Sequence, residues 1–164
     1  MKIAGMIQDS IVDGPGLRFV VFTQGCDKDC EGCHNPAAKD PAGGTEVSTE
    51  SIISEMNKNP LTDGLTLSGG EPLLQAGECV KLAVAAREKG LNVWVYSGFT
   101  YEELTEMANT DLAVAELLRL TDTLVDGQFK IAERTLQLRW RGSRNQRVID
   151  VPESLASGNV VVLS

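Results

Sequence analysis

The sequence lacks a long hydrophobic run, holds one histidine and four cysteines among 164 residues, and is short of positive charge. No apolar stretch approaches the roughly 20 residues of a membrane-spanning helix, so we expect no such helix. The first ten residues, MKIAGMIQDS, contain no long apolar stretch after Lys2, so we expect no secretory signal and a cytoplasmic protein. The net charge of −8 argues against nucleic acid or a membrane surface as the main partner.

The composition is ordinary for a globular protein, with 42% hydrophobic and 23% charged residues. The length fits one domain with one core, so we expect a single domain over 1–164. The charge is uneven, because the basic segment, residues 130–147, holds one acidic residue, Glu133, among six basic ones. This segment is either a solvated basic face or a docking site for an acidic partner. Its basic residues are Lys130, Arg134, Arg139, Arg141, Arg144 and Arg147.

Short apolar segments alternate with amphipathic ones, a pattern that indicates parallel β/α architecture. Fewer strands are present than the eight of a complete β/α barrel, so we expect an α/β fold with a partial barrel, open on one side. The predicted helices run from about Ser48 to before Pro60, over roughly 73–89, from the Thr100 cap onward, and from Leu112 to Arg119. The predicted strands cover 19–22, 65–67, 91–96, 123–126, 147–150 and 159–163.

Unusual residues follow four of the predicted strands. A cysteine-rich loop follows 19–22, SGG follows 65–67, Ser97-Gly98 follows 91–96, and Asp126-Gly127 ends 123–126. Loops at the carboxyl ends of parallel strands share one face, which carries the chemistry in folds of this kind. We therefore expect one site there, with Asp126 lining its cavity.

The cysteine loop, GCDKDCEGCHNP at 25–36, spaces Cys26, Cys30 and Cys33 as CxxxCxxC. An odd number of cysteines in a reducing compartment indicates metal binding rather than a disulfide. Zinc held by these cysteines and His34 is one candidate. Two observations count against zinc: Cys33 and His34 are adjacent, so their side chains diverge, and the sequence holds no second, separated pair of ligands.

The fourth cysteine, Cys79, is predicted to belong to the core. It shares one apolar helix face with Leu82, Ala83 and Ala86, at the spacing i, i+3, i+4 and i+7. Three remaining thiolates suit a 4Fe–4S cluster with one iron left open to an exogenous ligand.

Three motifs in order carry a family resemblance. The CxxxCxxC loop after a strand, followed by a second strand and SGGEP, resembles the radical S-adenosylmethionine superfamily. The stretch VDGPGLRFVVFTQGCDKDCEGCHNP (12–36) resembles the activating enzymes of glycyl-radical enzymes. The segments LVDGQF (124–129) and LRWRGSRNQRVIDV (138–151) are similar to the subfamily that activates anaerobic ribonucleotide reductases.

The resemblance implies an enzyme with two cofactors, a 4Fe–4S cluster on the three cysteines and S-adenosylmethionine on the open iron. One electron, from a donor such as flavodoxin or ferredoxin, would cleave the sulfonium to methionine and a 5′-deoxyadenosyl radical. That radical would take a hydrogen atom from a glycine of the reductase. No catalytic residue beyond the cluster and S-adenosylmethionine is implied.

The resemblance also implies cofactor contacts. Glu71 would help to fix the loop, and Ser97 would contact the ribose or methionine, although SGGEP and Ser97-Gly98 are also ordinary turns by composition. The wider superfamily has an aromatic residue near the adenine where this sequence has Gly32, so His34 either takes over that contact or caps a turn. The full set is Gly32, Cys33, His34, Ser68, Gly69, Gly70, Glu71 and Ser97, the backbones of 68–70 facing the methionine amino group.

Other functions fit parts of this pattern. Within the same superfamily, the alternatives are an activator of another glycyl-radical enzyme, of the pyruvate formate-lyase type, and a small-molecule enzyme such as 7-carboxy-7-deazaguanine synthase. The segment GSRNQR favours the reductase activator. A different class would be a zinc-stabilised binding module or a ferredoxin-like electron carrier, which metal analysis distinguishes.

Overall fold

The computed structural model describes residues 1–163, which form one seven-stranded sheet with the order β3-β1-β2-β4-β5-β6-β7. The four central strands, β2, β4, β5 and β6, are parallel, and β1, β3 and β7 join the sheet antiparallel. The sheet is open, because its end strands β3 and β7 do not pair with each other. The strands are β1 (Lys2–Ser10), β2 (Arg18–Thr23), β3 (Thr45–Glu46), β4 (Gly64–Gly69), β5 (Asn92–Tyr96), β6 (Thr123–Asp126) and β7 (Arg147–Asp150).

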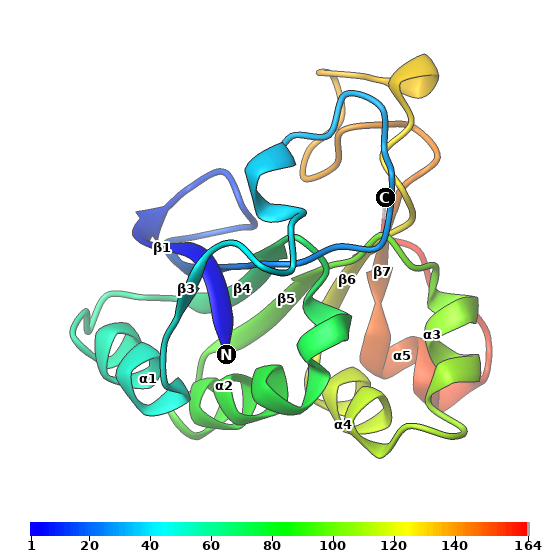
Figure 1. Cartoon of the computed structure of the whole chain (residues 1–164). Coiled ribbons are helices and arrows are strands. Elements are labelled where there is room, and N and C mark those ends of the chain that lie inside the picture. Colours follow the sequence, from blue (N-terminus) through cyan, green and yellow to red (C-terminus); the bar gives the residue numbers. More distant parts are fainter. Residues whose placement is uncertain (164) are drawn as a thin grey trace.

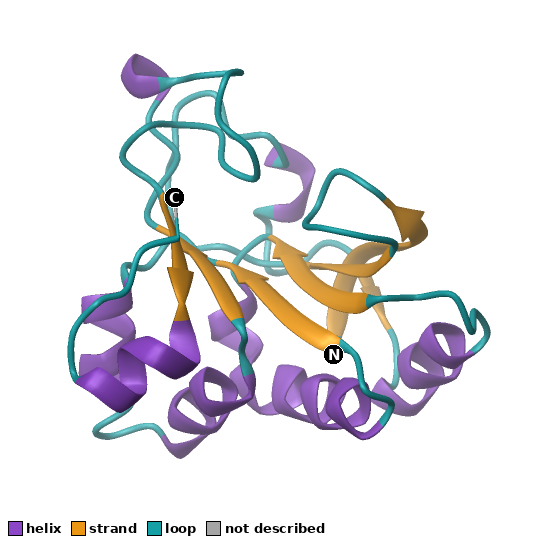
Figure 2. Cartoon of the chain, turned by 180° about the vertical axis from the view of Figure 1, so that it is seen from behind, coloured by secondary structure: helices purple, strands orange, loops and turns teal. Residues whose placement is uncertain are grey.

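The helices gather on one side of the sheet and the long loops on the other, as Figure 1 shows and Figure 2 shows from behind. The apolar core lies between sheet and helices, where Leu65 and Leu67 of β4 meet Leu82 and Ala83 of α2. No helix within residues 1–163 is long and apolar enough to span a membrane. The helices are α1 (Thr49–Asn57), α2 (Ala76–Glu88), α3 (Tyr101–Met107), α4 (Leu112–Leu120) and α5 (Val151–Ser157), with short 3₁₀ turns η1 (Pro36–Ala38), η2 (Pro72–Gln75) and η3 (Ile131–Glu133).

Polar caps fix where the helices begin. The side chain of Ser48 accepts a hydrogen bond from the Ser51 N–H at the start of α1. Thr100 and Glu103 form a reciprocal capping box on α3, which satisfies two backbone donors that the helix leaves free. The predicted start of α1 at about Ser48 and the predicted Thr100 cap of α3 are therefore confirmed.

A buried arginine anchors the amino-terminal end of the sheet. Arg18 opens β2 and donates to Thr66 Oγ1 at 2.6 Å, to the Leu65 carbonyl at 2.9 Å and to the Pro15 carbonyl at 2.9 Å. Its guanidinium also lies 5.5 Å from the ring centre of Trp94, and burial lowers the pKa of Arg18 to about 10. The turn before β2 is thus tied to β4 by one side chain.

The sequence missed one strand and predicted another that the structure does not show as a strand. The amino-terminal residues form β1, which the sequence did not indicate because polar and apolar residues do not alternate regularly along it. The expected strand at 159–163 is reduced to a single bridge between Val162 and Ile149, since the chain first forms the unexpected helix α5 and returns past β7 only briefly. The other five predicted strands are present, and β7 runs antiparallel to β6.

Candidate active site

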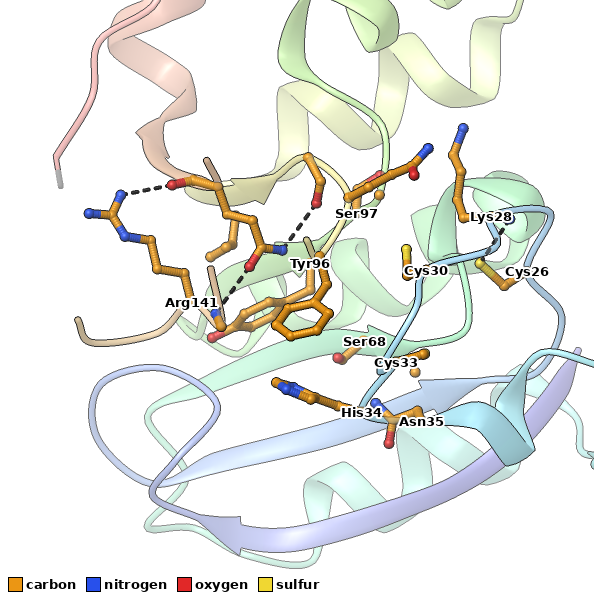
Figure 3. A pocket seen from close by; sticks show the side chains of 18 of the residues that line it. Cys26, Lys28, Cys30, Cys33, His34, Asn35, Ser68, Tyr96, Ser97 and Arg141 are labelled. Atoms are coloured by element: carbon orange, nitrogen blue, oxygen red, sulfur yellow. Dashed lines mark hydrogen bonds between the residues drawn. The ribbon is translucent and has the colours of Figure 1, made fainter. Parts of the chain in front are cut away.

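A cavity of about 670 Å³ opens at the carboxyl ends of the parallel strands, on the side of the sheet away from the helices. Its walls come from the cysteine loop, the SGGE turn after β4, the loop after β5 and the segment 127–146 after β6 (Figure 3). The expected convergence of these loops on one site is therefore confirmed. The expected site residues that line it are Cys26, Cys30, Cys33, His34, Ser68, Gly69, Gly70, Glu71 and Ser97, whereas Gly32 and Asp126 do not.

The three cysteines of the loop are free thiols, half-buried and facing the cavity. The Lys28 N–H donates to Cys26 Sγ at 3.4 Å, and the Cys33 N–H donates to the Cys30 carbonyl at 3.1 Å, which turns the loop inward. Burial raises the pKa of the Cys26 and Cys30 thiols, while backbone hydrogen bonds oppose the rise.

This donor set fits an iron–sulfur cluster. Within residues 1–163, no three histidine, cysteine or acidic side chains meet closely enough to hold a single metal ion. A 4Fe–4S cluster binds each thiolate through a different iron, so three thiols spread around one cavity suit it. Cys79 is fully buried in the core of α2 and donates toward the Pro72 carbonyl at 3.5 Å, as expected of a core residue.

The two glycines of SGGE let β4 approach the cysteine loop. A side chain at Gly69 would collide with the backbone of Thr23, and one at Gly70 would collide with the Gly25 carbonyl. The Gly70 N–H donates to the Thr23 carbonyl and the Glu71 N–H to the Gly25 carbonyl, both at 2.8 Å. Glycine, which has no side chain, allows such a close approach of two backbones. The structure shows that the partner of this approach is the backbone just before Cys26.

Glu71 joins two walls of the cavity from a buried position. Its carboxylate accepts hydrogen bonds from the Ser97 hydroxyl at 2.9 and 3.1 Å and from the Gly98 N–H at 2.7 Å. It also accepts from the Leu73 N–H at 3.1 Å, which caps η2. Burial raises the pKa of Glu71 to about 7, although these hydrogen bonds and the charge of Lys28 favour the ionised form. The side chain therefore fixes the loop after β4 to the loop after β5.

The motif GSRNQ shapes the segment 127–146, which lies above the cysteine loop (Figure 1). Gln146 Oε1 accepts from the Gly142 and Ser143 N–H groups at 3.0 and 3.1 Å, and its Nε2 donates to the Gly127 carbonyl at 3.0 Å. Asn145 Nδ2 donates to the Gln128 carbonyl at 2.8 Å. The motif therefore holds the two ends of this segment together.

His34 packs against that segment. Its ring centre lies 4.7 Å from that of Phe129, with the two planes tilted by 46°. A side chain at Gly142 would collide with the His34 ring and crowd the Phe129 ring, so this glycine permits the contact. Gly32, at φ +74°, lies beside Ile131 and Phe129 outside the cavity wall. Phe129 lines the cavity, and only its place in the motif LVDGQF could have indicated it.

Comparison with known proteins identifies the family. The family described as a 4Fe-4S single cluster domain matches residues 12–149. The chain belongs to this family. The anaerobic ribonucleoside-triphosphate reductase-activating protein of Enterobacteria phage T4 is 33% identical over 144 residues, which cover 84% of this chain and 86% of that protein. The protein of the same name from Escherichia coli (strain K12) is 34% identical over 146 residues, covering 84% and 91%.

A third relative is the pyruvate formate-lyase-activating enzyme of Clostridium pasteurianum, 36% identical over 121 residues that cover 68% of this chain and 50% of that enzyme. The resemblance to activating enzymes of glycyl-radical enzymes is thus confirmed. The family match begins at Val12 and extends beyond Gln146, so it includes every wall of the cavity.

The expectation that Asp126 lines the cavity was wrong. Its buried carboxylate accepts from the Tyr101 N–H at 2.8 Å and from Arg147 Nε at 3.1 Å. Arg147 also pairs with Glu102, so both residues serve the packing of α3 against the sheet. Asp126 cannot reach the cavity because its strand ends with the side chain turned toward α3 and β7.

The basic segment divides into internal and surface residues. Arg147 is paired with Asp126, and Arg141 Nη1 donates to the Gln146 carbonyl at 2.8 Å. Leu136, which is 88% exposed, lies with Arg134 on the wall of the cavity. The basic residues that remain exposed are Lys130, Arg134, Arg139 and Arg144.

Proposed function

We propose that the protein is a radical S-adenosylmethionine enzyme that generates a glycyl radical on an anaerobic ribonucleotide reductase. One observation carries the proposal: the three free cysteines of a CxxxCxxC loop share a cavity with the SGGE turn. They do so in a chain that aligns over 84% of its length with proteins named as activators of that reductase.

Cys26, Cys30 and Cys33 would hold the 4Fe–4S cluster, which supplies the electron for cleaving the sulfonium of S-adenosylmethionine when bound. The volume of about 670 Å³ lies in the range of small-molecule pockets. The remaining walls would bind and orient that molecule, with the backbone of Ser68–Gly70 and Ser97 at one end and His34 with Phe129 at the other. Glu71 would act indirectly by holding two of these walls together.

The wider setting belongs to the same proposal. The open sheet would be the partial β/α barrel of radical S-adenosylmethionine enzymes, formed by a single domain over 1–164. The protein would work in the cytoplasm, accept electrons from a flavodoxin or ferredoxin, and bind neither nucleic acid nor membrane. The exposed residues of the basic segment, of which Arg134 lines the cavity, would help to recognise the reductase.

The test uses the reconstituted protein, S-adenosylmethionine, dithionite and a candidate anaerobic ribonucleotide reductase under argon. We expect an electron paramagnetic resonance signal of a glycyl radical on the reductase. Release of 5′-deoxyadenosine without that signal would reject the reductase as partner. A signal on a pyruvate formate-lyase instead would favour the second candidate, which the Clostridium relative supports. Zinc in the anaerobically purified protein, with no uptake of iron, would reject the cluster.

A further inference from the structure

Lys28 points into the cavity from an acidic stretch of the cysteine loop. The residues on either side of it, Asp27 and Asp29, are exposed, as is Glu31. Lys28 is half-buried and lines the cavity between Cys26 and Cys30 (Figure 3). It is the only basic residue between the first and the third cysteine.

The ammonium group of Lys28 rests on an aromatic ring of another wall. Its Nζ lies 3.7 Å from the ring centre of Phe99, within the distance at which a cation is attracted to the face of a ring. Phe99 is 9% exposed, so its ring is held by the core below it. Within residues 1–163, Lys28 forms no ion pair with a carboxylate, which leaves the ring as its partner.

Neighbouring residues make room for this contact. A side chain at Gly98 would lie 3.0 Å from Lys28 Cγ, so any larger residue there would crowd the lysine side chain. The N–H of the same glycine donates to Glu71, and the positive charge of Lys28 acts on that buried carboxylate. Lys28 therefore meets the loop after β5 at the point where Glu71 already fixes it.

We propose that Lys28 is a positioning residue, whose ammonium on the Phe99 ring holds the cysteine loop against the loop after β5. The effect of this contact on cofactor binding rests on the proposed function. In that function, the contact sets the distance between the three cysteines and the wall that carries Ser97. It also places one positive charge in the cysteine loop, whose other charged residues are acidic. Nearby charge is one of the terms that set the potential of an iron–sulfur cluster.

Three variants and one control variant test the proposal. Lys28→Met removes the charge and keeps the length of the side chain, and Lys28→Arg keeps a cation over the ring. The control variant is Lys81→Met. Lys81 is an exposed lysine of α2, where it pairs only with Glu78 in the same helix. Phe99→Leu removes the ring from the other side. The measurements are hydrogen exchange of residues 25–35 in the apo-protein, the dissociation constant of S-adenosylmethionine, and the midpoint potential of the reconstituted cluster.

For Lys28→Met we expect about fivefold faster exchange of the cysteine loop, about fivefold weaker binding of S-adenosylmethionine and a lower midpoint potential. Lys28→Arg and Lys81→Met should match the original protein. Phe99→Leu should loosen the same loop, and adding Lys28→Met to it should produce little further change. Exchange in α2 reports whether each variant is folded.

Unchanged exchange of the cysteine loop in folded Lys28→Met would overturn the proposal. Weaker binding by Lys28→Met and Lys28→Arg alike, with normal exchange, would also overturn it, because Lys28 would then contact S-adenosylmethionine itself. The exchange measurement needs neither cofactor nor reductase. If the original protein fails to cleave S-adenosylmethionine, the proposed function fails while the loop contact is still judged by exchange.

Discussion

Glu71 accepts hydrogen bonds from the Ser97 hydroxyl with both carboxylate oxygens, at 3.1 and 2.9 Å, in a site where the side chain is 1% exposed. One buried group therefore links the SGGE turn to the loop after β5. Three of the four walls of the cavity depend on this link, because the Glu71 N–H also donates to the Gly25 carbonyl of the cysteine loop.

The stability of the apo-protein should depend on the ionisation of Glu71. Burial raises its pKa from 4.5 to about 7, so the folded state favours the protonated carboxyl. The contribution of Glu71 to stability is therefore fullest below pH 4.5 and falls as the pH rises through 7. Relative to Glu71→Gln, the original protein should lose about 3 kcal/mol of unfolding free energy between pH 4 and pH 8. Urea unfolding at several pH values measures this difference, and a constant difference would contradict the prediction.

Gly70→Ala should be strongly destabilising. The added methyl group would meet the carbonyls of Gly25 and Ala38, two backbone groups that cannot move without shifting the cysteine loop. We expect a loss of roughly 3 kcal/mol in unfolding free energy and less iron bound after reconstitution. The control is Gly77→Ala in α2. There the added methyl group would have no atom from outside the helix backbone within 4 Å, so the substitution should stabilise the helix by up to about 1 kcal/mol. Equal unfolding free energies of the two variants would contradict the prediction, because the SGGE turn would then have shifted to accommodate the methyl group.

Cys79 should be inert while the fold persists. It is fully buried, and burial raises the pKa of its thiol to about 12, so almost no thiolate is present at pH 8. Brief treatment of the apo-protein with iodoacetamide, followed by mass spectrometry, should label Cys26, Cys30 and Cys33 and leave Cys79 unlabelled until urea is added. Cys79→Ala should still take up iron, whereas Cys30→Ala should not. Labelling of Cys79 in the folded protein would contradict its assignment to the core.

The place of the site could be predicted from the sequence because topology alone brings the parts together. Parallel strands at 19–22, 65–67 and 91–96 force their following loops to one end of the sheet. Helical periodicity was also sufficient to assign Cys79 to the core. Both inferences depend on short-range patterns, which a single sequence displays.

Contacts between distant segments could not be predicted in this way. The ring of Phe129 contacts His34, and Lys28 contacts Phe99. The two residues of each pair lie so far apart in the sequence that no local pattern predicts the contact. Asp126 was misplaced for the same reason, because its partner Arg147 belongs to a strand that pairs antiparallel with its own. The strand β1 was missed because it is partly exposed on both faces, which weakens the alternation that indicates a strand.

The exposed arginines of the basic segment should matter for the partner and not for cleavage of S-adenosylmethionine. We select Arg139 and Arg144, because Arg141 is engaged with the Gln146 carbonyl and its loss would disturb the segment itself. With the double reversal Arg139→Glu and Arg144→Glu, we expect about tenfold less glycyl radical at limiting reductase and normal cleavage without reductase. Because salt screens exposed charges, the defect should be larger in low salt than in high salt, and a salt series accompanies the assay to check this.

The control carries the same change of charge on the far side of the molecule. Lys81→Glu and Arg119→Glu place two reversals on α2 and α4, whose side chains are 59% and 61% exposed. Because α2 and α4 lie on the side of the sheet opposite the long loops, this variant should form the radical normally. If both double variants lose radical formation equally, net charge rather than the basic segment governs recognition. If the Arg139 and Arg144 variant also loses cleavage without reductase, the segment shapes the cavity, and the partner must be recognised elsewhere.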